Sequence, residues 1–255
     1  MRRSRLALPL VACAMLIAGA VAESPAYAAS ANQSTPTALT PGNDLIGALF
    51  YTQGHQVKQC AAVSVESPGK GYGIIETARQ CLDEANRGSI YFFPDYTPGS
   101  APKGHFQVLE TFYSSPKSFP GEQWDAAFAV VGKNGSGVPL NRVGQYDIEA
   151  IKNLTSISGT ANLAYYTSTN HQTACTNRAI KNYSGAPDTW QMNSCVISSR
   201  DIGSPLLQQW GAKHTWEVVG VATGSTGAGG LDAIGHYNEA SAWKLFSSAW
   251  QWAER

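Results

Sequence analysis

The cysteines are the first residues of this sequence whose side chains could form covalent or metal bonds. There are five, and no zinc-binding spacing or phosphate-binding loop accompanies them. Cys13 lies in an N-terminal apolar stretch, which leaves the even set Cys60, Cys81, Cys175 and Cys195. Four cysteines allow three pairings. The sequence-local pairing, Cys60–Cys81 and Cys175–Cys195, closes two loops of similar size, and each bond would add roughly 3 kcal/mol on the chain-entropy model.

The first 28 residues have the pattern of a secretory signal peptide. Three arginines precede an apolar stretch of 17 residues, 6–22, and Ala26-Tyr27-Ala28 supplies small residues for cleavage after Ala28. One alternative is a membrane anchor, for which this length is the lower limit. Another is a lipoprotein, because residues 10–13 resemble a lipid-attachment site. We expect cleavage and secretion, which places the other cysteines in an oxidising compartment and favours disulfides over free thiols.

The composition indicates a folded protein with little net charge. Apolar residues make up 43% of the chain and charged residues 14%, a balance that favours a packed core over disorder. Removing the signal peptide takes away three arginines and one glutamate and leaves 15 basic and 17 acidic residues. Such a chain has no basic field for nucleic acid or anionic lipid. No motif indicates a metal or an organic cofactor, and no membrane span is expected after signal removal.

Most of the chain after residue 44 consists of short apolar runs separated by Gly, Pro, Asn and Ser. This pattern is typical of an all-β sandwich or barrel, which would position the cysteines. Residues 29–44 precede the runs and are rich in Ser, Thr, Ala, Asn and Pro, so we expect a flexible lead or a short pro-segment there. The folded domain is predicted to span 45–255. The runs are Ile46–Tyr51, Ala61–Val65, Gly73–Ile75, Ile90–Phe93, Phe106–Leu109, Ala126–Val131, Leu163–Tyr166 and Trp216–Ala222.

The last stretch of the chain has a different period. Trp243, Phe246, Trp250 and Ala253 recur at helical spacing between Glu239 and Glu254. This predicts a terminal amphipathic helix that packs its aromatic side chains on the β structure. An aromatic ligand-binding face is the alternative.

Seven short segments are informative when they are considered together, in their order along the chain. They are Ile46–Phe50, Cys60–Val65, Thr77–Cys81, Phe93–Gly104, Trp124–Val131, Cys195–Pro205 and Val218–Val221. In this order they resemble the chymotrypsin/trypsin family of serine proteases, in its secreted bacterial form. The resemblance implies two perpendicular six-stranded β-barrels, at about 45–145 and 146–255, with an active site between them and a C-terminal helix. Each sequence-local disulfide would bracket one catalytic segment.

The family mechanism requires a serine nucleophile, a histidine base, an orienting aspartate and an oxyanion hole of backbone N–H groups. Carried over by motif, the aspartate is Asp125, the base position holds Gln80 and the nucleophile position holds Ile202. A glutamine amide does not titrate near neutral pH, so Gln80 cannot act as a general base. Isoleucine has no nucleophilic group. We expect Asp125 to accept a hydrogen bond from Gln80 and Ile202 to fill the adjacent space.

The oxyanion-hole positions are altered as well. Arg200 and Ile202 would supply its N–H groups, and Arg200 replaces a glycine that normally lets the backbone turn toward the oxyanion. The glycine-rich run 224–230 would line the family's specificity pocket, or else form a loop. No histidine stands in the base motif, and His55, which is the nearest to that end of the first barrel, is expected on a surface loop.

The sequence therefore predicts a secreted, catalytically impaired homologue of a trypsin-like endopeptidase. Losing one triad member costs about 10⁴ to 10⁶ in turnover, and here two are replaced. A cleft without chemistry could still hold an extended peptide or protein by strand-type hydrogen bonds. Two alternatives stay open. One is a hydrolase with residual or unconventional activity that recruits a group such as His55, and the other is an envelope-associated structural protein.

Overall fold

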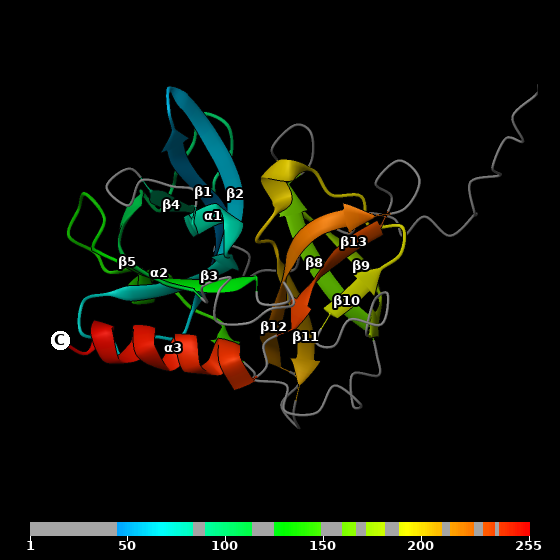
Figure 1. Cartoon of the computed structure of the whole chain (residues 1–255). Coiled ribbons are helices and arrows are strands. Elements are labelled where there is room, and N and C mark those ends of the chain that lie inside the picture. Colours follow the sequence, from blue (N-terminus) through cyan, green and yellow to red (C-terminus); the bar gives the residue numbers. More distant parts are fainter. Residues whose placement is uncertain are drawn as a thin grey trace, which may run out of the picture. The chain divides into compact units, whose positions relative to one another are not determined.

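The first β-barrel is built from six antiparallel strands (Figure 1). They are bonded in the order β1-β2-β3-β6-β5-β4, and β4 closes the ring on β1. Large apolar side chains such as Leu49, Phe92 and Phe106 are fully buried, and their burial stabilises the closed barrel. The strands are β1 Ile46–Gln53, β2 Gln56–Val65, β3 Gly73–Ala78, β4 Tyr91–Pro94, β5 Phe106–Tyr113 and β6 Ala126–Val131.

The second barrel also has six antiparallel strands, in the order β11-β8-β9-β10-β13-β12, and the pairing of β11 with β12 closes it. Trp190, Leu163 and Leu206 are fully buried in its core. A two-residue strand, β7 Asp147–Ile148, adds to β12 in parallel. The barrel strands are β8 Thr160–Tyr166, β9 Gln172–Lys181, β10 Thr189–Met192, β11 Pro205–Trp210, β12 Thr215–Thr226 and β13 Asp232–Tyr237. The predicted pair of six-stranded barrels is confirmed.

A third apolar cluster joins the two barrels and the C-terminal helix α3, Ala240–Ala253. It contains Phe128 from the first barrel, Val218 from the second and Phe246 from α3. The predicted terminal helix is confirmed, but the packing of its aromatic residues is only partly as expected. Phe246 is 3% exposed whereas Trp243 is 42% exposed, because Trp243 lies three residues earlier, near the edge of the buried stripe.

Both predicted disulfides are present. Cys60–Cys81 joins β2 to the short helix α1, Gln80–Asp83, with 6.1 Å between the Cα atoms. Cys175–Cys195 joins β9 to the segment before the 3-10 helix η5, Ser199–Asp201, with 5.7 Å between the Cα atoms. One more short helix, α2 Leu140–Val143, follows the first barrel.

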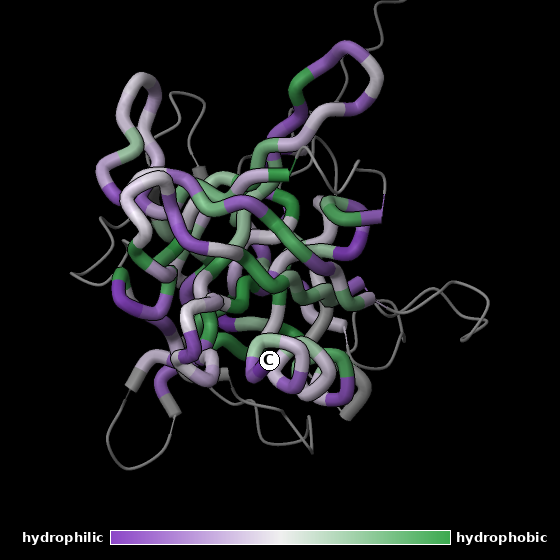
Figure 2. Tube along the Cα trace, turned by 90° about the vertical axis from the view of Figure 1, so that its left-hand side faces the viewer, coloured by the Kyte–Doolittle hydropathy of each residue, from purple (hydrophilic) through white to green (hydrophobic). Residues whose placement is uncertain are grey.

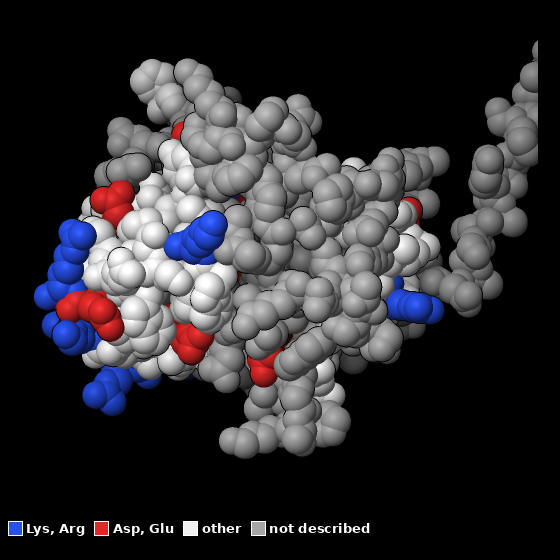
Figure 3. All heavy atoms as spheres, turned by 60° about the horizontal axis from the view of Figure 1, so that its bottom comes forward, with Lys and Arg blue, Asp and Glu red and all other residues white. Residues whose placement is uncertain are grey.

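This computed structural model describes residues 45–83, 90–113, 125–148, 160–166, 172–181, 189–210, 215–226, 232–237 and 240–255. The predicted signal peptide and lead segment lie outside these ranges, as do residues 227–230 of the glycine-rich run. Within them, no helix is long and apolar enough to cross a membrane. Hydrophobic segments run along the inner strands and the projecting loops are mostly hydrophilic (Figure 2). Acidic and basic side chains lie intermixed on the face drawn in Figure 3.

Candidate functional site

Gln80 stands where the first barrel turns toward the second. Strand β3 ends at Ala78, and the four-residue helix α1 begins at Gln80 itself. The disulfide of Cys81, the next residue, fixes this turn on β2. The position of Gln80 is therefore set by a covalent bond as well as by the strand before it.

The amide of Gln80 connects the two barrels. Its Nε2 donates to Asp125 Oδ2 at 3.3 Å and to the carbonyl oxygen of Thr223 at 2.8 Å. Asp125 lies directly before β6 and Thr223 lies in β12. Both acceptors require a donor, so the amide orientation with Nε2 facing them is the one that fits. The backbone N–H of Gln80 also donates to Asp125 Oδ1, at 3.3 Å.

The Asp125 carboxyl is largely withdrawn from water. Burial raises its pKa from the ordinary 3.8 to about 6, and this outweighs the opposing effects of the Gln80 hydrogen bonds and the Arg79 guanidinium. Arg79 is itself paired with Asp83 at 3.4 Å. The charge of Asp125 therefore changes close to neutral pH.

Ile202 follows the 3-10 helix η5, which holds Arg200 in its turn. The carboxylate of Asp201, 1% exposed, accepts hydrogen bonds from the N–H and the hydroxyl of Ser198, both at 2.7 Å. These bonds close the turn in the manner of a capping box. The Ile202 side chain packs against the first-barrel core, and its carbonyl accepts from the Ala61 N–H at 2.8 Å.

Gly203, two residues after η5, lies directly against the first barrel. Its φ is +86°, and a Cβ there would overlap the Ala61 carbonyl oxygen and Thr77 Oγ1. Its N–H donates to the Ala222 carbonyl at 2.8 Å. Only glycine satisfies both the backbone angle and the close approach.

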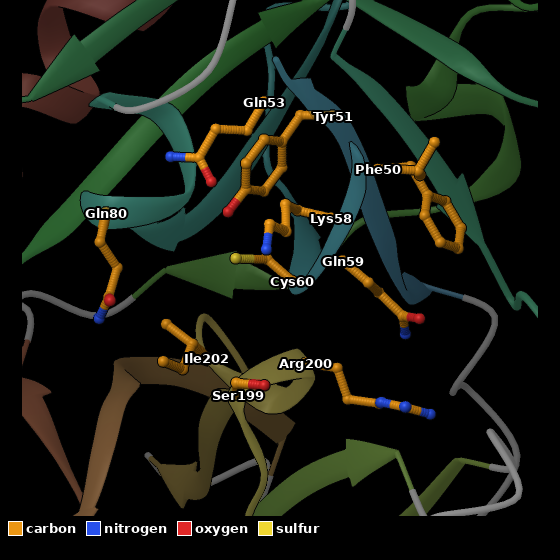
Figure 4. A pocket seen from close by; sticks show the side chains of 11 residues that line it. Phe50, Tyr51, Gln53, Lys58, Gln59, Cys60, Gln80, Ser199, Arg200 and Ile202 are labelled. Atoms are coloured by element: carbon orange, nitrogen blue, oxygen red, sulfur yellow. The ribbon is translucent and has the colours of Figure 1, made fainter. Parts of the chain in front are cut away.

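A pocket of about 460 Å³ opens beside Gln80 and Ile202, between the β1–β2 hairpin and η5 (Figure 4). Gln80, Arg200 and Ile202, all predicted from the sequence, line it together, whereas Asp125 lies behind Gln80 and does not. Sequence reasoning missed the wall that the hairpin provides. The one available signal was the polar start of β2 before Cys60. The lining residues are Phe50, Tyr51, Gln53, Val57, Lys58, Gln59, Cys60, Gln80, Ser199, Arg200 and Ile202.

None of the histidine side chains that the structure describes belongs to the lining of this pocket. His55 is exposed in the turn between β1 and β2, as expected. His105 contacts the rings of Tyr91 and Phe93. His171 and His214 fall outside the described ranges. Among the described residues no group of three or more His, Cys, Asp or Glu side chains could hold a metal ion.

Comparison with known proteins identifies the fold. No family model and no curated protein sequence matches the chain. Among solved structures, the protease Anisep from Arthrobacter nicotinovorans matches with a TM-score of 0.68 and 22% identity, over 85% of this chain and 100% of that one. A thermostable serine protease from an extremophilic microorganism matches with 0.68 and 18%, over 82% and 98%. A scabies mite inactivated protease paralogue matches with 0.60 and 13%, over 80% and 94%.

The two closed barrels, the C-terminal helix and these matches define the class of the molecule. The chain has the fold of the trypsin-like serine proteases. Because the identities are low, the likeness establishes architecture, and function has to be argued from the site.

Proposed function

We propose that this protein is a secreted, non-catalytic homologue of trypsin-like proteases that holds an extended peptide segment in the cleft between its barrels. The observation that carries the proposal is the Gln80 amide. Its N–H groups are directed to Asp125 and Thr223, and an amide neither takes nor gives a proton near neutral pH. The neighbouring Ile202 presents only hydrocarbon to the pocket.

The nearby serines do not supply an alternative nucleophile with a base. The Ser198 hydroxyl donates to Asp201, whose carboxylate closes the η5 turn. Ser199 lines the pocket, but the described lining contains no histidine. A solved protein of the same fold is described as an inactivated protease paralogue, so the fold itself does not require activity.

The edge of β2 supports peptide binding. Ala61 directs its N–H away from β1, to Ile202, and strand alternation places the backbone groups of Gln59 and Val57 on the same side. Within the described chain, β2 pairs with β3 only from Val63 onward. An extended peptide can add to such an edge by main-chain hydrogen bonds. Secretion is supported by the two disulfides, which are typical of an oxidising compartment.

The test uses the purified chain with both disulfides formed. We expect no cleavage of a broad fluorogenic peptide library and no labelling by a fluorophosphonate probe, together with measurable binding of fluorescent peptides from the same library. Labelling that maps to Ser198 or Ser199 would show a hydrolase and overturn the proposal. An absence of peptide binding would contradict the proposal that the cleft holds a peptide.

Two matched variants show whether the cleft is otherwise intact. Gln80→His with Ile202→Ser restores the base and the nucleophile, and adding Arg200→Gly restores the backbone freedom at the oxyanion position. Gain of cleavage in either variant would show that only the chemical groups are lost. A replacement of Ile202 by Trp should fill the pocket and weaken peptide binding.

A further inference from the structure

The C-terminal helix lines a second pocket, the α3 pocket, which shares no lining residue with the pocket beside Gln80. Its volume is about 460 Å³, within the range of small-molecule sites. One face of α3 forms most of its wall, and Glu66, directly after β2, forms the rest. The lining residues are Glu66, Trp243, Phe246, Ser247, Trp250, Gln251 and Glu254.

Three aromatic side chains stand along this face of the helix. The ring centroids of Trp243 and Phe246 are 5.3 Å apart, and those of Phe246 and Trp250 are 5.8 Å apart. Phe246 is 3% exposed, because it belongs to the cluster shared by both barrels, whereas Trp243 is 42% exposed. Packing of the barrels therefore accounts for Phe246 but leaves much of Trp243 in water, where an apolar ligand surface would cover it.

The charged side chains of the α3 pocket are both acidic. The Glu254 carboxylate accepts a hydrogen bond from Trp250 Nε1 at 3.1 Å, which holds it beside the indole ring. Glu254 forms no ion pair within the described part of the chain, and no lysine or arginine belongs to the described lining. Glu66 has other contacts within the chain. The uncompensated charge at this pocket is therefore that of Glu254.

An organic cation matches both properties of the pocket. Tryptophan rings attract cations as well as apolar groups, and a carboxylate attracts them by charge. Primary ammonium and guanidinium groups need several hydrogen-bond acceptors, whereas this wall is largely aromatic. A quaternary ammonium group has no N–H to satisfy, so its methyl groups would pack on the rings while Glu254 balances its charge.

We infer that the α3 pocket binds a quaternary ammonium group, with Trp243 and Trp250 packed on its methyl groups and Glu254 beside its charge. This site is independent of the proposed peptide cleft, and neither requires the other. The trimethylammonium group occurs on soluble molecules such as choline and on lipid headgroups, and it is the part that these ligands share.

The first experiment titrates the purified chain with choline by isothermal calorimetry. The comparison ligand is the neutral isostere of choline, in which a carbon atom replaces the charged nitrogen. The two molecules have the same shape, so the difference between their dissociation constants measures the contribution of the charge. Choline should bind about tenfold more tightly than the isostere. Equal affinities, or no binding of either molecule, would overturn the inference.

Matched variants locate the site. Trp243→Leu should weaken choline binding about five- to tenfold, whereas Trp252→Leu, on the same helix but packed on Tyr72 outside the pocket lining, should leave it unchanged. Glu254→Gln keeps an acceptor for Trp250 and should weaken binding about threefold or more. Melting temperatures show that each variant is folded.

The controls decide whether the pocket or the helix as a whole is responsible. Asp83→Asn removes a negative charge from α1 instead of from the pocket and should leave choline binding unchanged. An equal loss in Trp252→Leu and Trp243→Leu would contradict the contact assigned to Trp243. Unchanged binding in both Trp243→Leu and Glu254→Gln would mean that choline binds elsewhere, and the inference would be wrong.

Two further measurements separate the source of the group and the role of the cleft. Cosedimentation with phosphatidylcholine vesicles, but not with phosphatidylglycerol vesicles, would identify a lipid headgroup as the ligand. Choline binding without cosedimentation would identify a soluble ligand, and either result supports the quaternary ammonium site. Ile202→Trp, which fills the pocket beside Gln80, should leave choline binding unchanged. Its loss in that variant would place the cation in the cleft and overturn the inference, while the proposed peptide binding is tested separately.

Discussion

Two neighbouring parts of the molecule, the junction of the barrels at Gly203 and the wall of the pocket, differ in the side chains that they can accommodate. At the junction, Gly203 brings the chain against Ala61 and Thr77 with no room for a Cβ. On the pocket wall, the side chains of Arg200 and Ile202 face open space and line the pocket. The comparison shows that close packing restricts the residue type at Gly203 much more than at the pocket wall.

The largest expected effect comes from breaking the junction. Gly203→Ala should lower the free energy of unfolding by about 3 kcal/mol or more, because its Cβ overlaps backbone and its φ of +86° is strained for alanine. Urea denaturation measures the loss. Gly99→Ala is the matched control, since its φ of +79° is similar but nothing lies near its Cβ, so it should lose only about 1 kcal/mol. Equal losses would refute the steric account.

The second effect concerns the aspartate behind the pocket wall. The folded pKa of Asp125, about 6, lies above the ordinary 3.8, so folding favours the protonated carboxyl. The raised pKa of Asp125 therefore stabilises the fold fully below about pH 3.8. This contribution, roughly 3 kcal/mol at most, is lost as the pH rises through about 6. Asp125→Asn should flatten the fall in stability between pH 4 and pH 7, followed by urea denaturation at each pH. The control is Asp83→Asn, which changes the exposed carboxylate paired with Arg79. The fall in stability between pH 4 and pH 7 should remain in that variant.

The smallest expected change in the free energy of unfolding comes from replacing Gln80, which lines the pocket. Gln80→Leu removes the donor to Asp125 and Thr223 and should cost about 1–2 kcal/mol, because two partly buried acceptors lose a hydrogen bond. It should also raise the pKa of Asp125 further, since a donor to the charged form is lost. Thermal and urea denaturation measure the first effect, and the pH profile measures the second. Gln107→Leu, at an exposed position of β5, should change the stability by less than about 0.5 kcal/mol; a comparable loss there would mean that Gln80 has no special structural role.

The sequence was most informative where burial produces apolar runs. All six strands of the first barrel overlap a predicted run, and the helix predicted between Glu239 and Glu254 is α3. Strand β9 had no such signal, because its buried positions carry small residues, Ala174, Cys175 and Ala179, between polar ones. Hydrophobicity alone therefore could not distinguish β9 from a loop.

The candidate site was predictable in its parts and not in its assembly. Motif order placed Gln80, Asp125 and Ile202 in one neighbourhood, and the structure brings Gln80 to both Asp125 and the pocket of Ile202. Their assignment to the triad positions stays a prediction. Lys58 and Gln59 were not predicted, because the polar start of β2 does not by itself show that the folded hairpin lies opposite η5.

The apolar cluster shared by both barrels and α3 has a consequence for how the molecule comes apart. Phe128, Val218 and Phe246 come from the two barrels and the helix, and they bury one another, so neither barrel can open without exposing surface of the other. Loss of either barrel would strip the remaining one of part of its core. The barrels should therefore unfold as a single cooperative unit, in which the slowest-exchanging amides of β3 and β12 share one opening free energy.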